Sequence, residues 1–153
     1  MQILSVPSHA PLVRDRAAAV ELIQIANDPL VEAAHAHPSK FRALLAMPLQ
    51  FPDAAVQELD RLAGRPEVVG TIVVGSAGGR QLNDPEILPL FAELERRNLP
   101  FLLHPISPPG LDCMLELNLA NVVGFMFESA SEAEAIGGTN AARLLGIPIE
   151  TGT

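Results

Sequence analysis

The amino-acid sequence predicts an α/β fold in which parallel β-strands alternate with α-helices. Short aliphatic runs of strand length are separated by longer segments whose apolar residues recur at helical spacing. The chain contains no Trp or Tyr, and its aliphatic composition suits strands that are buried beneath helices. Strands joined by helical crossovers run parallel. At 153 residues, the chain has the length of one domain.

The first half contains two strand–helix units, each with an aliphatic run followed by a helical segment. A proline within the first helical segment predicts a break or kink at Asn27–Asp28–Pro29, because proline clashes with the preceding turn. Gly64 is the predicted stop of the second helix. The predicted elements are, in order, a strand over 2–7, a helix over 14–35, a strand over 41–49 and a helix over 52–64.

The second half begins with the same alternation and then becomes less regular. The β-branched run at 68–74 is typical of a buried strand, and the segment 85–98 shows the clearest amphipathic helical pattern. The predicted elements are a strand over 68–74, a glycine-rich loop over 75–80, a helix over 85–98, a strand over 100–104, and C-terminal helices within 111–120 and 131–145. We expect a single domain over 1–153, with strand–helix units over 1–129 and a helical segment over 130–153.

Charge and composition argue against several classes of partner. The formal net charge is −8, with 10 Lys and Arg against 18 Asp and Glu, which disfavours nucleic acid because its binding relies on neutralising phosphates. No apolar run approaches the roughly 20 residues of a membrane span, and Met1–Ala10 shows no secretory signal. The single Cys113 cannot form an internal disulfide, so we expect a cytoplasmic protein.

His104 is the strongest candidate functional residue, because it ends the otherwise apolar strand Phe101–Leu102–Leu103. Ligands of parallel α/β folds gather at the carboxyl ends of the strands, where an imidazole can ligate a metal. The alternative is a histidine that hydrogen-bonds a neighbouring carbonyl at a strand end. Spacing alone leaves both interpretations open. His9, after the first strand, is a weaker candidate for the same region.

His35 and His37 form a His-x-His pair, but they are expected at the end of a helix. There, residues two apart point roughly 200° away from each other, so we predict a surface role instead of a metal pair. Cys113 has no evident base partner, and we expect a partly buried thiol.

The glycine-rich segment Gly75–Arg80 follows a strand and precedes a helix, a setting in which backbone N–H groups bind phosphate. It lacks the spacing of the dinucleotide-binding fingerprint, and no Gly-Lys-Ser or Gly-Lys-Thr follows. Arg80 is a candidate partner for an anion. A flexible crossover loop is the favoured interpretation, with anion binding as the alternative.

Several motifs, in order, resemble the amidohydrolase-related family typified by aminocarboxymuconate-semialdehyde decarboxylase. The resemblance covers roughly 2–129. The matching segments are His37–Leu44, Met47–Gln50, Pro52–Val56, Gly79–Phe91, Leu99–Pro105 and Val123–Ser129. Members of that family are metal-dependent (β/α)₈ barrels that carry out hydrolysis, hydration or nonoxidative decarboxylation with a divalent ion, usually zinc. The resemblance implies that His104 is a metal ligand and that the substrate is a small carboxylate.

The sequence departs from the family pattern at its other metal ligands. We find neither the first-strand His-x-His pair, nor the later histidine strand, nor the last-strand aspartate, whereas 137–146 resembles the family's C-terminal helix. The chain therefore reads as a partial (β/α)₈ TIM-type barrel, with about four parallel strands and C-terminal helices. A catalytic zinc needs about three protein ligands, so we expect the chain alone to be incomplete or inactive.

Three functional hypotheses follow from these observations. The first is a metal-dependent hydrolase or decarboxylase whose remaining ligands come from elsewhere, with a homo-oligomer covering the open sheet edges. The second is a noncatalytic remnant that binds a small ligand or dimerises. The third is a small phosphate-binding module that uses Gly75–Arg80.

Overall fold

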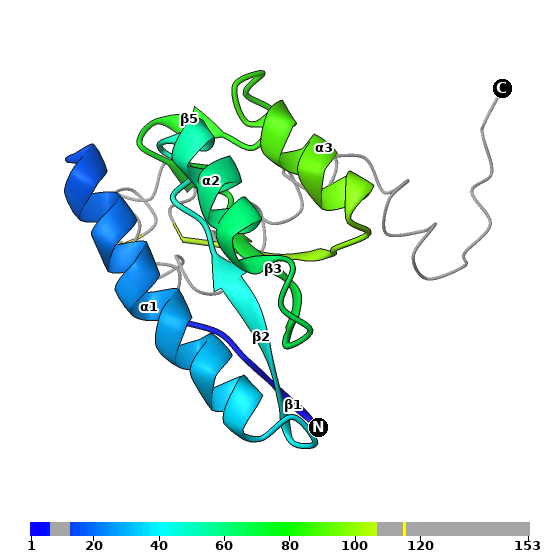
Figure 1. The fold of residues 1–153 in the computed structure, drawn as a ribbon. Helices are drawn as coiled ribbons and strands as arrows, with labels where there is room; N and C mark the ends of the chain where they lie inside the picture. Colours follow the sequence, from blue (N-terminus) through cyan, green and yellow to red (C-terminus); the bar gives the residue numbers. More distant parts are fainter. Residues whose placement is uncertain (7–12, 107–114, 116–153) are drawn as a thin grey trace, which may run out of the picture.

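The computed structural model describes residues 1–6, 13–106 and 115, and its centre is a four-stranded parallel sheet. The strands lie in the order β1-β2-β3-β6 and curl into half of a barrel (Figure 1). Their bounds are β1, Gln2–Leu4; β2, Phe41–Ala46; β3, Val68–Val74; and β6, Phe101–His104. Each connection between neighbouring strands returns through a helix, which gives the parallel arrangement that the sequence predicted.

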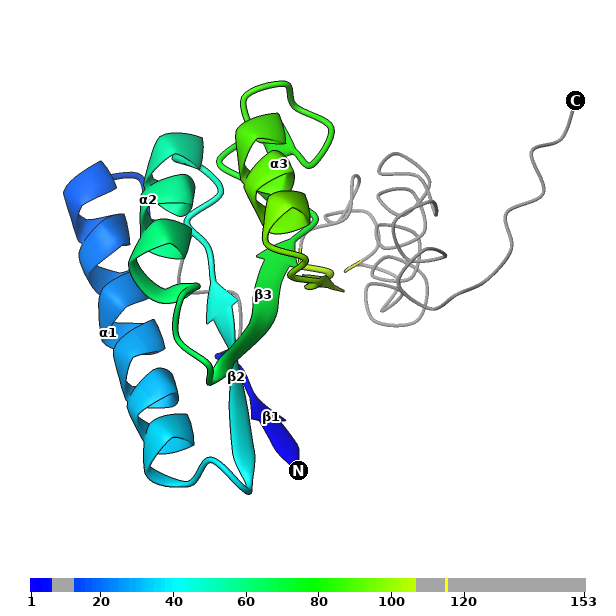
Figure 2. The same ribbon diagram turned by 45° about the vertical axis from the view of Figure 1, so that its right-hand side comes forward.

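Three helices lie side by side on the convex face of this sheet, as Figure 2 shows. They are α1, Arg16–Ala36; α2, Pro52–Leu62; and α3, Leu88–Arg96. The side chain of Asp15 caps α1 by accepting a hydrogen bond of 2.8 Å from the Ala18 N–H. The core between sheet and helices includes Val31, Ala34, Ala43, Leu45, Leu59, Leu62, Val73, Leu90 and Leu94.

Helix α1 continues past Pro29, so of the break or kink predicted at Asn27–Asp28–Pro29, the break is wrong. The buried residues Ile23, Asn27, Val31 and Ala34 recur at helical spacing on both sides of the proline. Pro29 itself is exposed. The packing of one continuous buried stripe against the sheet outweighs the hydrogen bond that proline removes.

The glycine-rich segment forms a hairpin, which corrects the expectation of a flexible loop. Strands β4, Ser76–Ala77, and β5, Arg80–Gln81, pair antiparallel around Gly78 and Gly79. Both glycines have positive φ, 61° and 83°, the conformation that tight hairpin turns require. A Cβ on Gly78 would lie 2.8 Å from the Gln50 Cβ, so the hairpin packs directly on the segment after β2.

Two edge strands present apolar side chains on the concave face. Leu4 is in register with Ala43, a core residue beneath the helices, so Ile3 points to the opposite face. Leu102 likewise alternates with Phe101 and Leu103, which pack on the core. Ile3 is 58% exposed and Leu102 is 51% exposed.

The elements predicted beyond His104 lie almost entirely outside the described residues. This applies to the helices within 111–120 and 131–145, and the division of the domain at residue 129 stays a prediction. Within the described part of the chain, no helix has the length and apolarity to cross a bilayer.

Candidate functional site

The carboxyl ends of the four parallel strands meet along one edge of the sheet. We call this edge the carboxyl rim and define it as the described residues that end or follow each strand: Ser5–Val6, Met47–Gln50, Gly75–Ala77 and His104–Ile106. The opposite edge, where the strands begin, is the amino rim. In barrel-type α/β proteins the carboxyl rim carries the chemistry and the amino rim carries stability.

His104 lies on the carboxyl rim, where the sequence predicted it. It ends β6 and is in register with Val74, the last residue of β3. Because side chains alternate along a strand, His104 shares the concave face with Leu102. Its ring is half-buried, and Nδ1 lies 2.9 Å from the carbonyl oxygen of Pro105.

The Pro105 contact determines the role of each ring nitrogen. A carbonyl oxygen only accepts hydrogen bonds, so Nδ1 of His104 carries the proton. In the neutral ring, Nε2 then holds the lone pair. Histidines that ligate metals commonly donate their other N–H to a backbone carbonyl in this way, which fixes the tautomer and orients the ring. The sequence analysis treated a hydrogen bond from His104 to a neighbouring carbonyl as the alternative to metal binding. The two roles are compatible, because the carbonyl contact uses Nδ1 and a metal would bind Nε2.

Gln50 contacts two other segments near the carboxyl rim, although the sequence did not indicate it as a site residue. Its Nε2 donates a hydrogen bond of 3.3 Å to the carbonyl of Val13, just before α1, and its Cβ faces Gly78 of the hairpin. Gln50 thus joins segments that follow three different strands. The signal in the sequence was only its position directly after the second strand.

His35 and His37 lie at the amino rim, far from His104 along the sheet. Nδ1 of His35 is 2.5 Å from Oε1 of Glu67, which precedes β3. The His37 ring packs edge-on against Phe41, with centroids 6.0 Å apart. His35 contacts a carboxylate and His37 a phenyl ring, which agrees with the predicted surface role.

The Arg80 guanidinium is already paired with two carboxylates. Its Nη1 lies 3.0 Å from Oδ2 of Asp84, and its Nη2 lies 2.8 Å from Oε2 of Glu86. An incoming anion would compete with both carboxylates. Together with the hairpin conformation, this pairing argues against a phosphate-binding module at Gly75–Arg80, and anion binding there stays untested.

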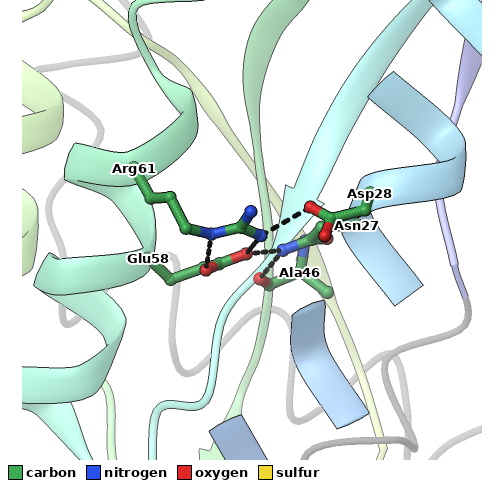
Figure 3. A network of polar contacts seen from close by, with 5 residues as sticks. All are labelled: Asn27, Asp28, Ala46, Glu58 and Arg61. Carbon is green, nitrogen blue, oxygen red and sulfur yellow. Dashed lines mark hydrogen bonds and ion pairs between the residues drawn. The ribbon is translucent and has the colours of Figure 1, made fainter. Parts of the chain in front are cut away.

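A buried polar network anchors the end of β2 to the helices, as Figure 3 shows. Asn27 of α1 is fully buried, and its side-chain amide bonds both backbone groups of Ala46, accepting from the N–H at 2.9 Å and donating to the carbonyl at 3.0 Å. It also donates to Glu58 of α2 at 2.8 Å. Arg61 holds Glu58 through Nε at 2.8 Å and reaches Asp28 at 2.7 Å. Hydrogen bonding to Glu58, then to Asp28, raises the pKa of Arg61.

The described residues contain no group of three His, Cys, Asp or Glu side chains arranged to hold a metal ion. His104 is the one predicted ligand that the structure places on the carboxyl rim. His9 and Cys113 lie outside the described residues.

Comparison with known proteins identifies the family. The amidohydrolase family model matches residues 3–126. The chain belongs to the amidohydrolase family. This confirms the resemblance found in the sequence, and it agrees with the half-barrel of parallel strands.

Several proteins similar to this chain are decarboxylases. Gamma-resorcylate decarboxylase of Rhizobium radiobacter is 39% identical over 109 residues, 65% of this chain and 33% of that protein. The enzyme of the same name from Rhodococcus jostii is 34% identical over 119 residues, 70% of this chain and 36% of that protein. The 2-amino-3-carboxymuconate-6-semialdehyde decarboxylase of Dictyostelium discoideum is 29% identical over 111 residues, 72% of this chain and 31% of that protein.

Solved structures of decarboxylases also resemble this chain. A 2,6-dihydroxybenzoate decarboxylase from Rhizobium superposes with a TM-score of 0.77 at 30% identity, over 93% of this chain and 47% of that one. A dihydroxybenzoic acid decarboxylase from Polaromonas, with bound manganese and the inhibitor 2-nitroresorcinol, gives 0.76 at 28% identity, over 95% and 47%. The amidohydrolase chain described here spans about a third of the curated relatives and about half of these structures.

Proposed function

We propose that this chain forms part of a metal-dependent decarboxylase that acts on a small aromatic carboxylate. One observation carries the proposal: His104 ends a strand at the carboxyl rim of an amidohydrolase-family half-barrel, with Nδ1 donating to the Pro105 carbonyl. This leaves Nε2 as the nitrogen with ligand character. The similar decarboxylases act on aromatic or related carboxylates by their names, which supports the substrate class.

The described residues fit a divalent ion only in part. His104 suits a ligand role, but a catalytic ion takes about three protein donors, and the described residues supply no such group. We therefore propose that the remaining donors come from outside these residues, and that the chain alone is incomplete as a catalyst. Zinc was the metal that the family resemblance implied. Manganese is bound in the Polaromonas structure, so we propose a divalent ion without specifying zinc.

The proposed reaction is nonoxidative. The bond between the ring carbon and the carboxylate breaks, carbon dioxide leaves, and a proton takes its place on the ring, so no redox cofactor is required. A divalent ion supplies Lewis-acid binding of the substrate's oxygens. From this chain, His104 contributes one oriented imidazole, and Leu102 and Ile3 contribute an apolar concave surface against which an aromatic ring can pack.

Manganese titration followed by NMR tests the role of His104. The chain has four histidines, and the paramagnetic ion broadens the ring signals of those that bind it. We expect the His104 signals to broaden at lower manganese concentration than those of His35 and His37, which lie at the amino rim. His104→Ala should abolish the site, whereas His35→Ala should leave it intact. Equal broadening of all rings, or broadening led by His35 and His37, would contradict the proposal.

The number of metal ligands on this chain also predicts how much metal it binds. With one imidazole on the carboxyl rim and no completed ligand set among the described residues, we expect the purified chain to carry well under one equivalent of zinc or manganese and to show no decarboxylase turnover by itself. A full equivalent of metal by elemental analysis, lost in His104→Ala, would show that the donor set is complete within one chain.

The alternative candidate is a noncatalytic remnant that binds a small ligand or dimerises. The exposure of Ile3 and Leu102 on the two edge strands favours an association role. Either function is compatible with a homo-oligomer, and the single cysteine supports placement in the cytoplasm. Failure of manganese to broaden His104, combined with stable self-association, would favour this alternative.

A further inference from the structure

We propose that an open cavity between α1 and α2 binds a small zwitterion, an ammonium and a carboxylate joined to a short apolar chain as in an α-amino acid. The cavity has a volume of about 200 Å³, below the roughly 300–1,000 Å³ of pockets for drug-sized ligands. It lies between helices that run side by side (Figure 2), and the proposal does not depend on the decarboxylase chemistry. The lining residues are Asp28, Val31, Glu32, Arg61, Leu62 and Arg65.

The two helices line this cavity with opposite charges. Asp28 and Glu32 are four residues apart, on the same face of α1, and form an acidic wall. Arg61, in the last turn of α2, and Arg65, which follows that helix, form a basic wall. Because Arg65 also precedes β3, the cavity lies toward the amino rim, at the end of the sheet opposite His104.

One acid–base pair closes across the cavity, and the next one stays open. Nη2 of Arg61 lies 2.7 Å from Oδ1 of Asp28. One turn further along both helices, no ion pair joins Glu32 to Arg65 in the described part of the chain. The ion pair of Arg65 is the contact of Nε with Oε2 of Glu67 at 3.5 Å, longer than the roughly 2.7–2.9 Å of a charge-assisted hydrogen bond. The terminal nitrogens of Arg65 can therefore bind a ligand.

The rest of the lining favours a ligand with a short apolar chain. Val31 and Leu62 are 2% and 5% exposed and belong to the hydrophobic core, so they form the base of the cavity. Glu58 accepts hydrogen bonds from Nε and Nη2 of Arg61 and holds the guanidinium in place, as Figure 3 shows. This part of the basic wall is thus ordered before a ligand arrives, which lowers the entropic cost of binding.

The open Glu32–Arg65 couple determines the charge that the ligand must carry. An ammonium alone would contact Glu32 and be repelled by Arg65, and a carboxylate alone would contact Arg65 and be repelled by Glu32. A zwitterion contacts both side chains with opposite charges, its ammonium donating to Glu32 and its carboxylate accepting from Arg65.

NMR titration of the full 153-residue chain with L-leucine tests the proposal. We expect saturable shifts of the backbone amides that line the cavity, with millimolar affinity because solvent screens exposed charges. Three probes lack one part of leucine each: 3-methylbutylamine lacks the carboxylate, 4-methylpentanoate lacks the ammonium, and glycine lacks the apolar chain. Each should bind more weakly than leucine. Absence of saturable shifts with leucine, or equal binding of the amine or the carboxylate, would overturn the proposal.

Two variants test whether the cavity is the site. Glu32→Gln and Arg65→Gln should each weaken leucine binding by about three- to fivefold, the change expected from one exposed ion pair. Glu21→Gln on α1 and Arg96→Gln on α3, at exposed residues that do not line the cavity, should bind leucine as the unmodified chain does. Unchanged affinity in either cavity variant would show that leucine binds elsewhere, and the proposal would be wrong.

Discussion

The side-chain amide of Asn27 occupies the place of a neighbouring strand beside Ala46. Strand β1 pairs with β2 only as far as Ala43, and among the described residues no strand pairs with the backbone of Ala46 on that side. Asn27 accepts from its N–H and donates to its carbonyl, and Glu58 holds the amide in place. The end of β2, and with it the start of the Met47–Gln50 rim segment, is thus fixed by one helical side chain.

We expect Asn27→Ala to destabilise the fold by about 2–4 kcal/mol, because it leaves two buried backbone groups without partners. Chemical denaturation monitored by circular dichroism measures the change. Gln24→Ala, which truncates a half-buried amide on the same helix, is the control and should cost clearly less. An equal loss in both variants would show that the Ala46 bonds contribute little.

Gly70 marks a close approach between strands. A Cβ at this position would lie 2.4 Å from the Pro100 carbonyl oxygen and 3.0 Å from a methyl of Leu44. Gly70→Ala should therefore displace β6 or β3 and cost roughly 1–3 kcal/mol, as overpacking does. Gly64→Ala is the matched control, because nothing lies within 4 Å of its Cβ position. Thermal melts of the two variants compare them directly, and similar melting temperatures would refute the predicted clash.

Thr71 carries a buried hydroxyl that has no hydrogen-bond partner among the described residues. The residue is fully buried in β3. Thr71→Val keeps the shape and removes the unsatisfied oxygen, so we expect a gain of about 1 kcal/mol in the free energy of unfolding. Thr71→Ser keeps the oxygen and loses the methyl, and it should destabilise. Urea denaturation tests both, and a loss in Thr71→Val would indicate that the hydroxyl has a partner.

The His35–Glu67 contact predicts a specific acid sensitivity. The hydrogen bond from His35 holds the pKa of Glu67 below its usual range. Because the folded-state pKa is lowered, the stabilisation is complete above the unfolded pKa of about 4.3 and is lost as pH falls through the folded pKa. We expect His35→Ala to flatten the dependence of unfolding free energy on pH in that acid range.

His37→Ala is the control for this pH profile, because His37 contacts the Phe41 ring and not Glu67. Asp53 and Glu93, whose pKa values are lowered by Arg16 and Arg96, contribute to the same acid range in both variants. If the pH profile of His35→Ala is the same as that of the unmodified chain, His35 does not lower the pKa of Glu67.

The sequence predicted those elements whose local pattern and tertiary environment agree. Residues 68–74 form β3 with the predicted bounds, because a β-branched run is buried in the middle of the sheet. The strand ending at His104 was also predicted, since an apolar run stops there before a proline. Family membership followed from motifs spread over these same elements.

The remaining features depend on contacts that a local pattern does not carry. Helix α1 passes Pro29 because Asn27 and Val31 pack on the sheet. The hairpin that pairs Ser76 with Gln81 packs on Gln50, a residue far away in sequence. Arg80 pairs with Asp84 and Glu86, and the sequence alone did not show these pairs at the candidate anion site.

The separation of His35–Glu67 at the amino rim from His104 at the carboxyl rim has a practical consequence for engineering. The loops after β2 and β3 lie at the carboxyl rim. We expect that they can be exchanged for those of other family members without changing the His35–Glu67 contact at the amino rim. A grafted variant should then keep the contribution that the His35–Glu67 contact makes to stability in acid.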